Sequence, residues 1–163
     1  MSSLSRFIEL FNSANGVVPP LTTEELEIGK PVAIPTDEDG NNTSVVVTGK
    51  IKEGFAGSVT FKYMRVDVSK LLTGIELTAI VPAGINIATQ AMSSINAQYG
   101  LDVPLEDVVD NVITFPTATI QMDPESYEWV GELTVSLEYR PVNISTPIVD
   151  GNVDGFERLH LNN

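Results

Sequence analysis

The stretch "INAQYGLDVPL", residues 95–105, repeats the pattern of an earlier stretch, "FNSANGVVPPL", residues 11–21. The two stretches share four residues at identical spacing, which are Asn12 and Asn96, Gly16 and Gly100, Pro20 and Pro104, and Leu21 and Leu105. A glycine in this position is typical of a left-handed cap at the C-terminus of a helix. Each stretch therefore predicts the end of a helix followed by a proline–leucine turn.

Apolar residues at helical spacing precede both glycines. Leu4, Phe7 and Phe11 lie on one stripe, with Ser2 or Ser3 available as the N-cap. The second predicted helix runs from about residue 89 to residue 98. The acidic segments "TTEEL" and "PLEDVVD" follow the two turns, and each predicts a short capped turn of helix.

Alternating apolar residues predict several strands after the helices. The predicted strands are 44–51, 57–68, 74–81, 112–121 and 132–140. A second echo joins "FAGSVTFKY", residues 55–63, to "WVGELTVSL", residues 129–137. Short apolar sequences also recur by chance, but two matches in the same order along the chain favour an internal duplication.

The sequence thus predicts a strand-dominated α+β chain built from two tandem pseudo-repeated units. Each unit would hold one helix and antiparallel strands in a sandwich-like arrangement. The predicted divisions are residues 1–72, residues 73–141 and an extended C-terminal arm, residues 142–163. A unit of this size is too small to be confidently stable alone, so we expect the two to share a core.

Composition excludes several classes of function. The 163 residues carry a formal net charge of −13 and include no cysteine. Disulfides, thiolate metal sites and a cysteine nucleophile are therefore excluded. The acidic surface disfavours binding to nucleic acid and to anionic membranes. Without a signal-peptide pattern or a long apolar run, we expect a soluble protein made in a reducing cytoplasm.

No set of residues predicts catalysis. The single histidine, His160, could be combined with Ser145 and Asp150 into a hydrolase triad, but no nucleophile motif surrounds Ser145. Pairs of carboxylates are expected by chance among 22 acidic residues. We therefore predict that the protein is not an enzyme and needs no cofactor.

A calcium site is one interpretation of "DGNVDG", residues 150–155. Asp150, Asn152 and Asp154 have the spacing of the first ligands of a calcium loop. The twelfth position of a calcium loop that starts at Asp150 holds Leu161 in place of the bidentate glutamate. Sequences rich in Asp, Asn and Gly also form ordinary turns. Calcium binding and a plain turn both stay open.

Three further regions are candidates for contact with other molecules. Trp129 and Tyr127 could form an interface anchor or a sugar platform, or pack inside the fold. The loop at residues 36–42, with Asp37 and Asp39, reads as an exposed hairpin tip or a second cation site. The arm could add a strand to a neighbour's sheet edge, and its candidate contact residues are Ile144, Ile148 and Phe156.

Several of these motifs together carry a resemblance. "NAQYGL" at 96–101, the acidic turn after it, "GSVTFKYMRVD" at 57–67 and "VDGF" at 153–156 resemble virion structural proteins of large tailed bacteriophages (Caudoviricetes, of the jumbo myovirus type). The resemblance spans most of the chain and supplies no catalytic residues. It implies a non-enzymatic component of the head, neck or tail, present in several copies.

The resemblance also implies partners and a location. The chain would bind itself and neighbouring virion proteins, as a homo-oligomer in the particle, after synthesis in the host cytoplasm. A different class stays open as the alternative, a β-rich carbohydrate-binding or receptor-recognition module, with or without calcium.

Overall fold

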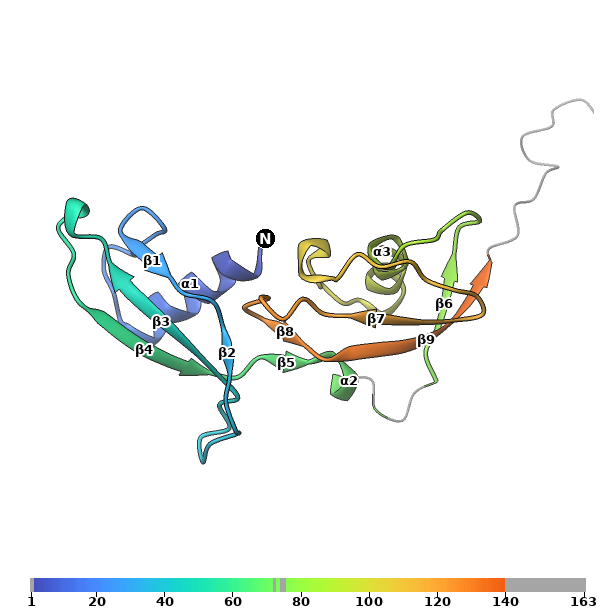
Figure 1. Cartoon of the computed structure of the whole chain (residues 1–163), viewed down its shortest axis with the longest axis horizontal. Helices are drawn as coiled ribbons and strands as arrows, with labels where there is room; N and C mark the ends of the chain where they lie inside the picture. The colour runs from blue at the N-terminus through green and yellow to red at the C-terminus, as the bar shows by residue number, and fades with distance from the viewer. Residues whose placement is uncertain (1, 72, 74–75, 140–163) are drawn as a thin grey trace, which may run out of the picture.

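The computed structural model describes residues 2–71, 73 and 76–139. The fold is α+β, with strands dominating over helices, and it forms two lobes that lie side by side (Figure 1). Within the described residues, no helix is long and apolar enough to cross a membrane.

The first lobe packs one helix against one sheet. Its elements are α1 (Ser3–Asn15), β1 (Leu26–Ile28), β2 (Val32–Ala33), β3 (Thr43–Gly49), the 3-10 turn η1 (Ile51–Glu53) and β4 (Ser58–Tyr63). All pairings in this sheet are antiparallel. β1 and β2 pair with successive parts of β3, and β4 pairs with the other edge of β3. Phe7 and Phe11 of α1 pack on Val45 and Val47 of β3 to form the first core.

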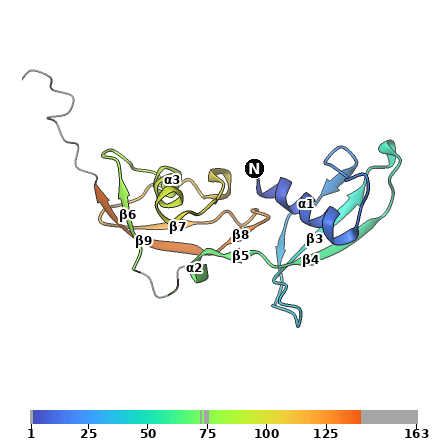
Figure 2. The same ribbon diagram turned by 180° about the vertical axis from the view of Figure 1, so that it is seen from behind.

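The chain then crosses to the second lobe. β5 (Val66–Asp67) runs between the lobes and pairs in parallel with β8 (Trp129–Val130), and the short helix α2 (Val68–Leu71) follows (Figure 2). Val68 is fully buried in the second core. The crossing therefore lies near Met64 and Arg65, a few residues before the predicted division at residue 72.

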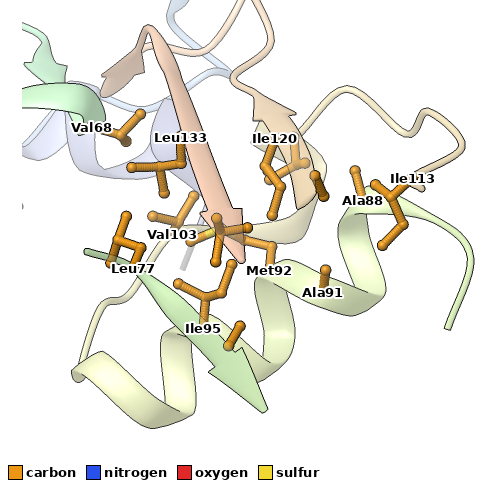
Figure 3. Packing of buried hydrophobic residues seen from close by; sticks show 14 of the residues in the cluster. Val68, Leu77, Ala88, Ala91, Met92, Ile95, Val103, Ile113, Ile120 and Leu133 are labelled. Atoms are coloured by element: carbon orange, nitrogen blue, oxygen red, sulfur yellow. The ribbon is translucent and has the colours of Figure 1, made fainter. Parts of the chain in front are cut away.

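The second lobe also places a helix over a sheet. Its elements are β6 (Thr78–Val81), α3 (Ala88–Tyr99), the 3-10 turn η2 (Leu105–Asp107), β7 (Thr117–Gln121) and β9 (Glu132–Tyr139). β9 is the central strand of the order β6-β9-β7. Figure 3 shows Met92 and Ile95 of α3 pointing into the core toward Ile120 and Leu133, and all four side chains are at most 2% exposed.

One prediction about this sheet is wrong. Each unit was expected to hold antiparallel strands only, but β6 pairs with β9 in parallel, from Thr78 opposite Ser136 to Val81 opposite Tyr139. The reason is that α3 and β7 lie between the two strands in sequence, and such a long crossover allows parallel pairing.

The first sequence echo has a structural counterpart. Gly16 and Gly100 both adopt left-handed conformations, with φ of 60° and 66°. The Asn12 side chain donates to the Leu21 carbonyl at 2.8 Å and accepts from the Leu21 N–H at 3.0 Å. Asn96 makes the same pair of bonds with Val103, at 2.8 and 3.3 Å. Each asparagine thus fastens the following turn to the end of its helix.

The tandem duplication itself stays a prediction. β6 precedes α3 in the second lobe, whereas no strand precedes α1 within the part of the chain that the structure describes. The common part is a helix, a capped turn and an antiparallel hairpin, β3–β4 in one lobe and β7–β9 in the other.

Two strand boundaries differ from their predictions. The strand expected over 57–68 breaks after Tyr63, because the chain leaves the first core there. The strand expected from residue 112 begins at Thr117, directly after Pro116, which has no N–H to donate. "TTEEL" forms the single capped turn that was predicted, because the Leu26 N–H donates to the Thr22 carbonyl at 3.1 Å and the Thr22 N–H donates to Glu25 Oε2 at 2.8 Å, and this turn leads into β1.

Candidate functional site

A buried arginine joins the two lobes. Arg65 is 5% exposed and lies where β4 gives way to β5. Its Nε donates to Thr43 Oγ1 at 2.8 Å, and its Nη1 donates to the carbonyl oxygens of Pro124 and Ser126 at 3.0 and 2.9 Å. Burial lowers the pKa of the guanidinium. Arg65 therefore ties the first sheet to residues 123–129, which we call the junction segment.

The start of α1 makes a second set of contacts between the lobes. Ser3 Oγ donates to Asp107 Oδ1 at 2.8 Å and accepts from the Tyr127 N–H at 3.3 Å. Asp107 is 5% exposed, and its Oδ2 has no hydrogen-bond partner among the described residues. Burial raises the pKa of this carboxyl. Arg6 adds ion pairs to Glu128, at 2.9 Å, and to Asp102.

Two aromatic residues of the junction segment were candidate interface anchors. Trp129 is 7% exposed and belongs to the second core, so the structure places it in the packing role. Tyr127 packs on Phe7 of α1, with ring centroids 5.4 Å apart, and its Oη donates to the Gly29 carbonyl at 3.1 Å. Tyr127 thus holds the two lobes of one chain together.

The acidic loop forms a hairpin tip between β2 and β3. Asp37 Oδ1 accepts from the N–H groups of Asp39 and Asn41, at 3.1 and 2.9 Å, and Lys62 Nζ lies 3.7 Å from Oδ2. The Asn41 side-chain bond is the main cause that lowers the pKa of Asp37. The oxygens of Asp37 are therefore already engaged in building the turn, while Asp39 is exposed.

The described residues hold no group of three or more His, Asp or Glu side chains placed to bind a metal ion. The remaining candidates lie outside the described residues, and their roles stay predictions. They are the calcium candidates Asp150, Asn152 and Asp154 and the arm residues Ile144, Ile148 and Phe156.

A cavity lies between the lobes, beside Arg65. It has a volume of about 620 Å³, and residues 31–33 of the first lobe face residues 121–124 and 130–132 of the second. Asp123 and Glu132 line it, but no hydroxyl or histidine side chain does. The lining therefore offers no nucleophile with an adjacent base.

The outer edge of β4 is the main unpaired backbone edge of the first lobe. β4 pairs with β3 alone among the described strands, whereas its counterpart β9 is paired on both edges. Val59 of β4 is 51% exposed, and the matching residue of β9, Leu133, is 2% exposed. An unpaired edge with exposed apolar side chains is a template for pairing with another strand.

A groove runs beside the end of this edge. The groove has a volume of about 250 Å³, with Leu10 and Phe7 of α1 on one side and Tyr63 and Met64 on another. The ion pair of Arg6 with Glu128 also lines it. Leu10 is 46% exposed and Met64 is 65% exposed. A helix face and a strand edge thus leave apolar surface uncovered at the same place.

The corresponding place in the second lobe is filled and closed. β6 lies there, on the outer edge of β9 and against α3 (Figure 1). Gln98 of α3 accepts from the Ile80 N–H at 3.1 Å and donates to the Thr78 carbonyl at 2.7 Å. Tyr99 Oη adds a bond to the same carbonyl at 2.9 Å. The outer edge of β6 is therefore occupied by helix side chains.

The junction between the lobes was not predicted from the sequence. The available signal was the alternation of residues 59–67, which puts Arg65 on the apolar face of its strand with Phe61 and Tyr63. A charged residue on such a face is usually paired or hydrogen-bonded when buried. The partners of Arg65 in the second lobe lie about sixty positions away and are backbone carbonyls, so no sequence pattern marks them.

A comparison with known proteins adds a family and nothing else. No curated protein and no solved structure matches the chain. A family model described as a family of unknown function, DUF7941, matches residues 3–161. Because the match covers both lobes and most of the residues after β9, the chain belongs to the DUF7941 family.

Proposed function

We propose that this chain is a non-enzymatic structural component of a tailed-phage virion that acts through protein–protein assembly. The observation that carries the proposal is the unpaired edge of β4 beside a groove where the apolar side chains of Leu10 and Met64 are exposed. Strand edges and apolar grooves are the surfaces that assembling proteins use for strand addition.

The junction supports the same proposal. Arg65, Asp107 and Tyr127 fix the first lobe to the second through buried hydrogen bonds and packing. A two-lobed unit of fixed shape can repeat with a constant geometry in a particle. The proposed partners are copies of this chain and neighbouring virion proteins, and the proposed location is the virion, after synthesis in the host cytoplasm.

The first test measures self-association. Light scattering of the full chain over a range of concentrations should give a discrete oligomer or a growing polymer, with the same mass in calcium and in chelator. A monomer at all concentrations would contradict assembly from this chain alone. A monomer that changes mass or compactness only with calcium would favour a calcium-dependent recognition module instead.

The second test addresses the particle itself. Quantitative mass spectrometry of gradient-purified phage particles encoding the chain should detect it at a fixed multiple-copy ratio to the major head or tail protein. A chain abundant in the infected cell but missing from purified particles would overturn the virion proposal.

A further inference from the structure

The free edge of β4 offers the same backbone groups that β9 uses to bind β6. The Tyr63 carbonyl accepts from the Asn42 N–H at 3.1 Å, on the side of β3. Because successive backbone groups of a strand point to opposite edges, the N–H of Lys62 points away from β3. Lys62 matches Ser136, whose N–H donates to the Leu77 carbonyl, just before β6, at 2.8 Å.

The residues after β9 contain a segment with the pattern of β6. Residues 77–81 read "LTAIV", and residues 144–148 read "ISTPI". The three residues of the first segment that face the core are Leu77, Ala79 and Val81, and their counterparts are Ile144, Thr146 and Ile148. In both segments a glycine follows three positions later, Gly84 and Gly151. The alternation that suits β6 to its place under a helix thus recurs in the tail.

A proline in the tail segment fits this alignment. Pro147 takes the position of Ile80, whose N–H donates to Gln98 and so points away from β9. The missing N–H of a proline at that position removes no bond to the accepting strand. It also leaves the new outer edge one donor short, which is how proteins discourage further strand addition.

Charge and position favour pairing between two copies. Residues 141–149, "PVNISTPIV", carry no charged side chain in a protein of net charge −13, so this segment approaches another copy with little repulsion. β9 ends at Tyr139, at the end of the molecule farthest from the first lobe (Figures 1 and 2). The last residue of β9 therefore lies at the end of the molecule opposite to the chain's own β4.

We propose that residues 144–148 of one chain add in parallel to the outer edge of β4 of a second copy. Ser145 then lies opposite Lys62, as Thr78 lies opposite Ser136, and Thr146 lies opposite Tyr63 at the groove. Ile144 and Ile148 flank Thr146 on the same face, with Ile148 just past the end of β4. The contact is head-to-tail, so repetition gives a ring or a filament. This inference rests on the proposed function and names its contact.

A cysteine pair tests the register directly, because the chain has no native cysteine. The full chain with Lys62→Cys and Ser145→Cys is oxidised, and its products are separated without reductant and weighed by mass spectrometry. The expected result is a ladder of disulfide-linked oligomers that collapses to the monomer on reduction. A mixture of the two single-cysteine chains should give mainly the mixed dimer.

The control pair is Lys52→Cys with Ser145→Cys, since Lys52 is exposed on η1 away from β4. Cross-linking of the test pair that does not exceed this control would overturn the inference. An intramolecular disulfide in a monomer would overturn it too, because the tail would then bind its own chain. An oligomer without the β4 cross-link would overturn this contact and leave the proposed function standing.

A second pair of variants needs no cross-link. Ile148→Asp places a charge in the proposed buried position, and Asn143→Asp places the same charge directly before the proposed strand, at a position that alternation puts on the opposite face. The dissociation constant from light scattering or sedimentation should rise at least about tenfold for Ile148→Asp, the effect expected for losing one buried isoleucine. It should change much less for Asn143→Asp, and equal effects would contradict the proposed face.

Discussion

β4 and β9 carry matching sequences but occupy different positions in their sheets. β9 lies between β6 and β7, and its Leu133 is 2% exposed. β4 pairs with β3 alone among the described strands, and its Val59, at the matching position, is 51% exposed. A strand pattern thus specifies a strand and its faces, whereas burial of that strand depends on whether a further strand is supplied.

The helices of the two lobes also differ in whether their side chains bind a strand edge. Gln98 and Tyr99 of α3 bind the backbone of β6, and the same positions of α1 hold Ala14 and Asn15. The Asn15 side chain donates to the Phe11 carbonyl of its own helix, so it closes no strand edge. The first lobe is therefore incomplete at both surfaces that surround β6 in the second.

The largest expected effect compares the two matching strand positions. Leu133→Ala should lower the free energy of unfolding by about 3 kcal/mol, because it opens a cavity in a filled core. Val59→Ala should change it by less than about 1 kcal/mol, because half of that side chain is already in solvent. Urea unfolding at a concentration where the chain is monomeric measures both. Equal losses would show that Val59 is as well packed as Leu133.

A smaller effect compares the glycines that precede the two strands. Gly57 and Gly131 have φ of 91° and 88°, a conformation that costs an alanine about 1 kcal/mol. A Cβ at Gly57 would meet no atom within 4 Å, whereas a Cβ at Gly131 would lie 2.5 Å from Asp67 Oδ1. That oxygen is held by the N–H and hydroxyl of Ser69, at 3.0 and 2.6 Å.

Gly131→Ala should therefore be the more destabilising variant, by about 2 kcal/mol against about 1 kcal/mol for Gly57→Ala. Thermal unfolding of both variants at the same concentration measures the difference. Equal losses would mean that the carboxylate of Asp67 moves aside at no cost.

The smallest effect concerns the contact between the lobes. Burial raises the pKa of Asp107, so the folded protein favours the protonated carboxyl, and ionisation destabilises the fold as the pH rises through the raised pKa. Asp107→Asn removes this penalty, and Ser3 Oγ can still donate to the amide oxygen. The variant should melt higher than the parent at pH 7. The gain should fade below about pH 4, where the carboxyl is protonated in both states.

A melting-temperature difference that stays the same from pH 3.5 to pH 7 would show that the charge of Asp107 carries no penalty. Asp102→Asn is the matched control, because Asp102 binds Arg6 at an exposed position of the same lobe. Its small effect should have the opposite sign at neutral pH, since it weakens an ion pair.

The sequence predicted the local parts of this fold well and the long-range parts poorly. The two capping glycines, both main helices and the hairpin strands were predicted because helix caps and alternation are local signals. The parallel pairing of β6 with β9 was missed, because nothing in residues 74–81 shows which strand they will meet. The sequence does not mark the crossing near Met64, because Val68 continues the alternation of the strand before it although it packs in the second core.

The candidate site was predictable only in part. The alternation of Ile144 and Ile148 in the sequence predicted a segment that could add to a neighbour's sheet edge. The outer edge of β4 could not be predicted as the accepting edge, because the sequence of a strand does not show whether another strand will lie beside it. Trp129 was ambiguous between surface and core, since an aromatic residue before a strand suits both positions, and only the packing of the second lobe places it.

The acceptors of Arg65 have a consequence for how this protein can vary. The guanidinium binds the carbonyl oxygens of Pro124 and Ser126, and every amino acid carries a carbonyl oxygen. Side chains at those two positions can therefore change while the angle between the lobes is kept. Arg65 itself has no such freedom, because lysine lacks the planar fork that reaches three acceptors at once. In related chains, the arginine should therefore be kept even where the residues around its two carbonyl acceptors have been substituted.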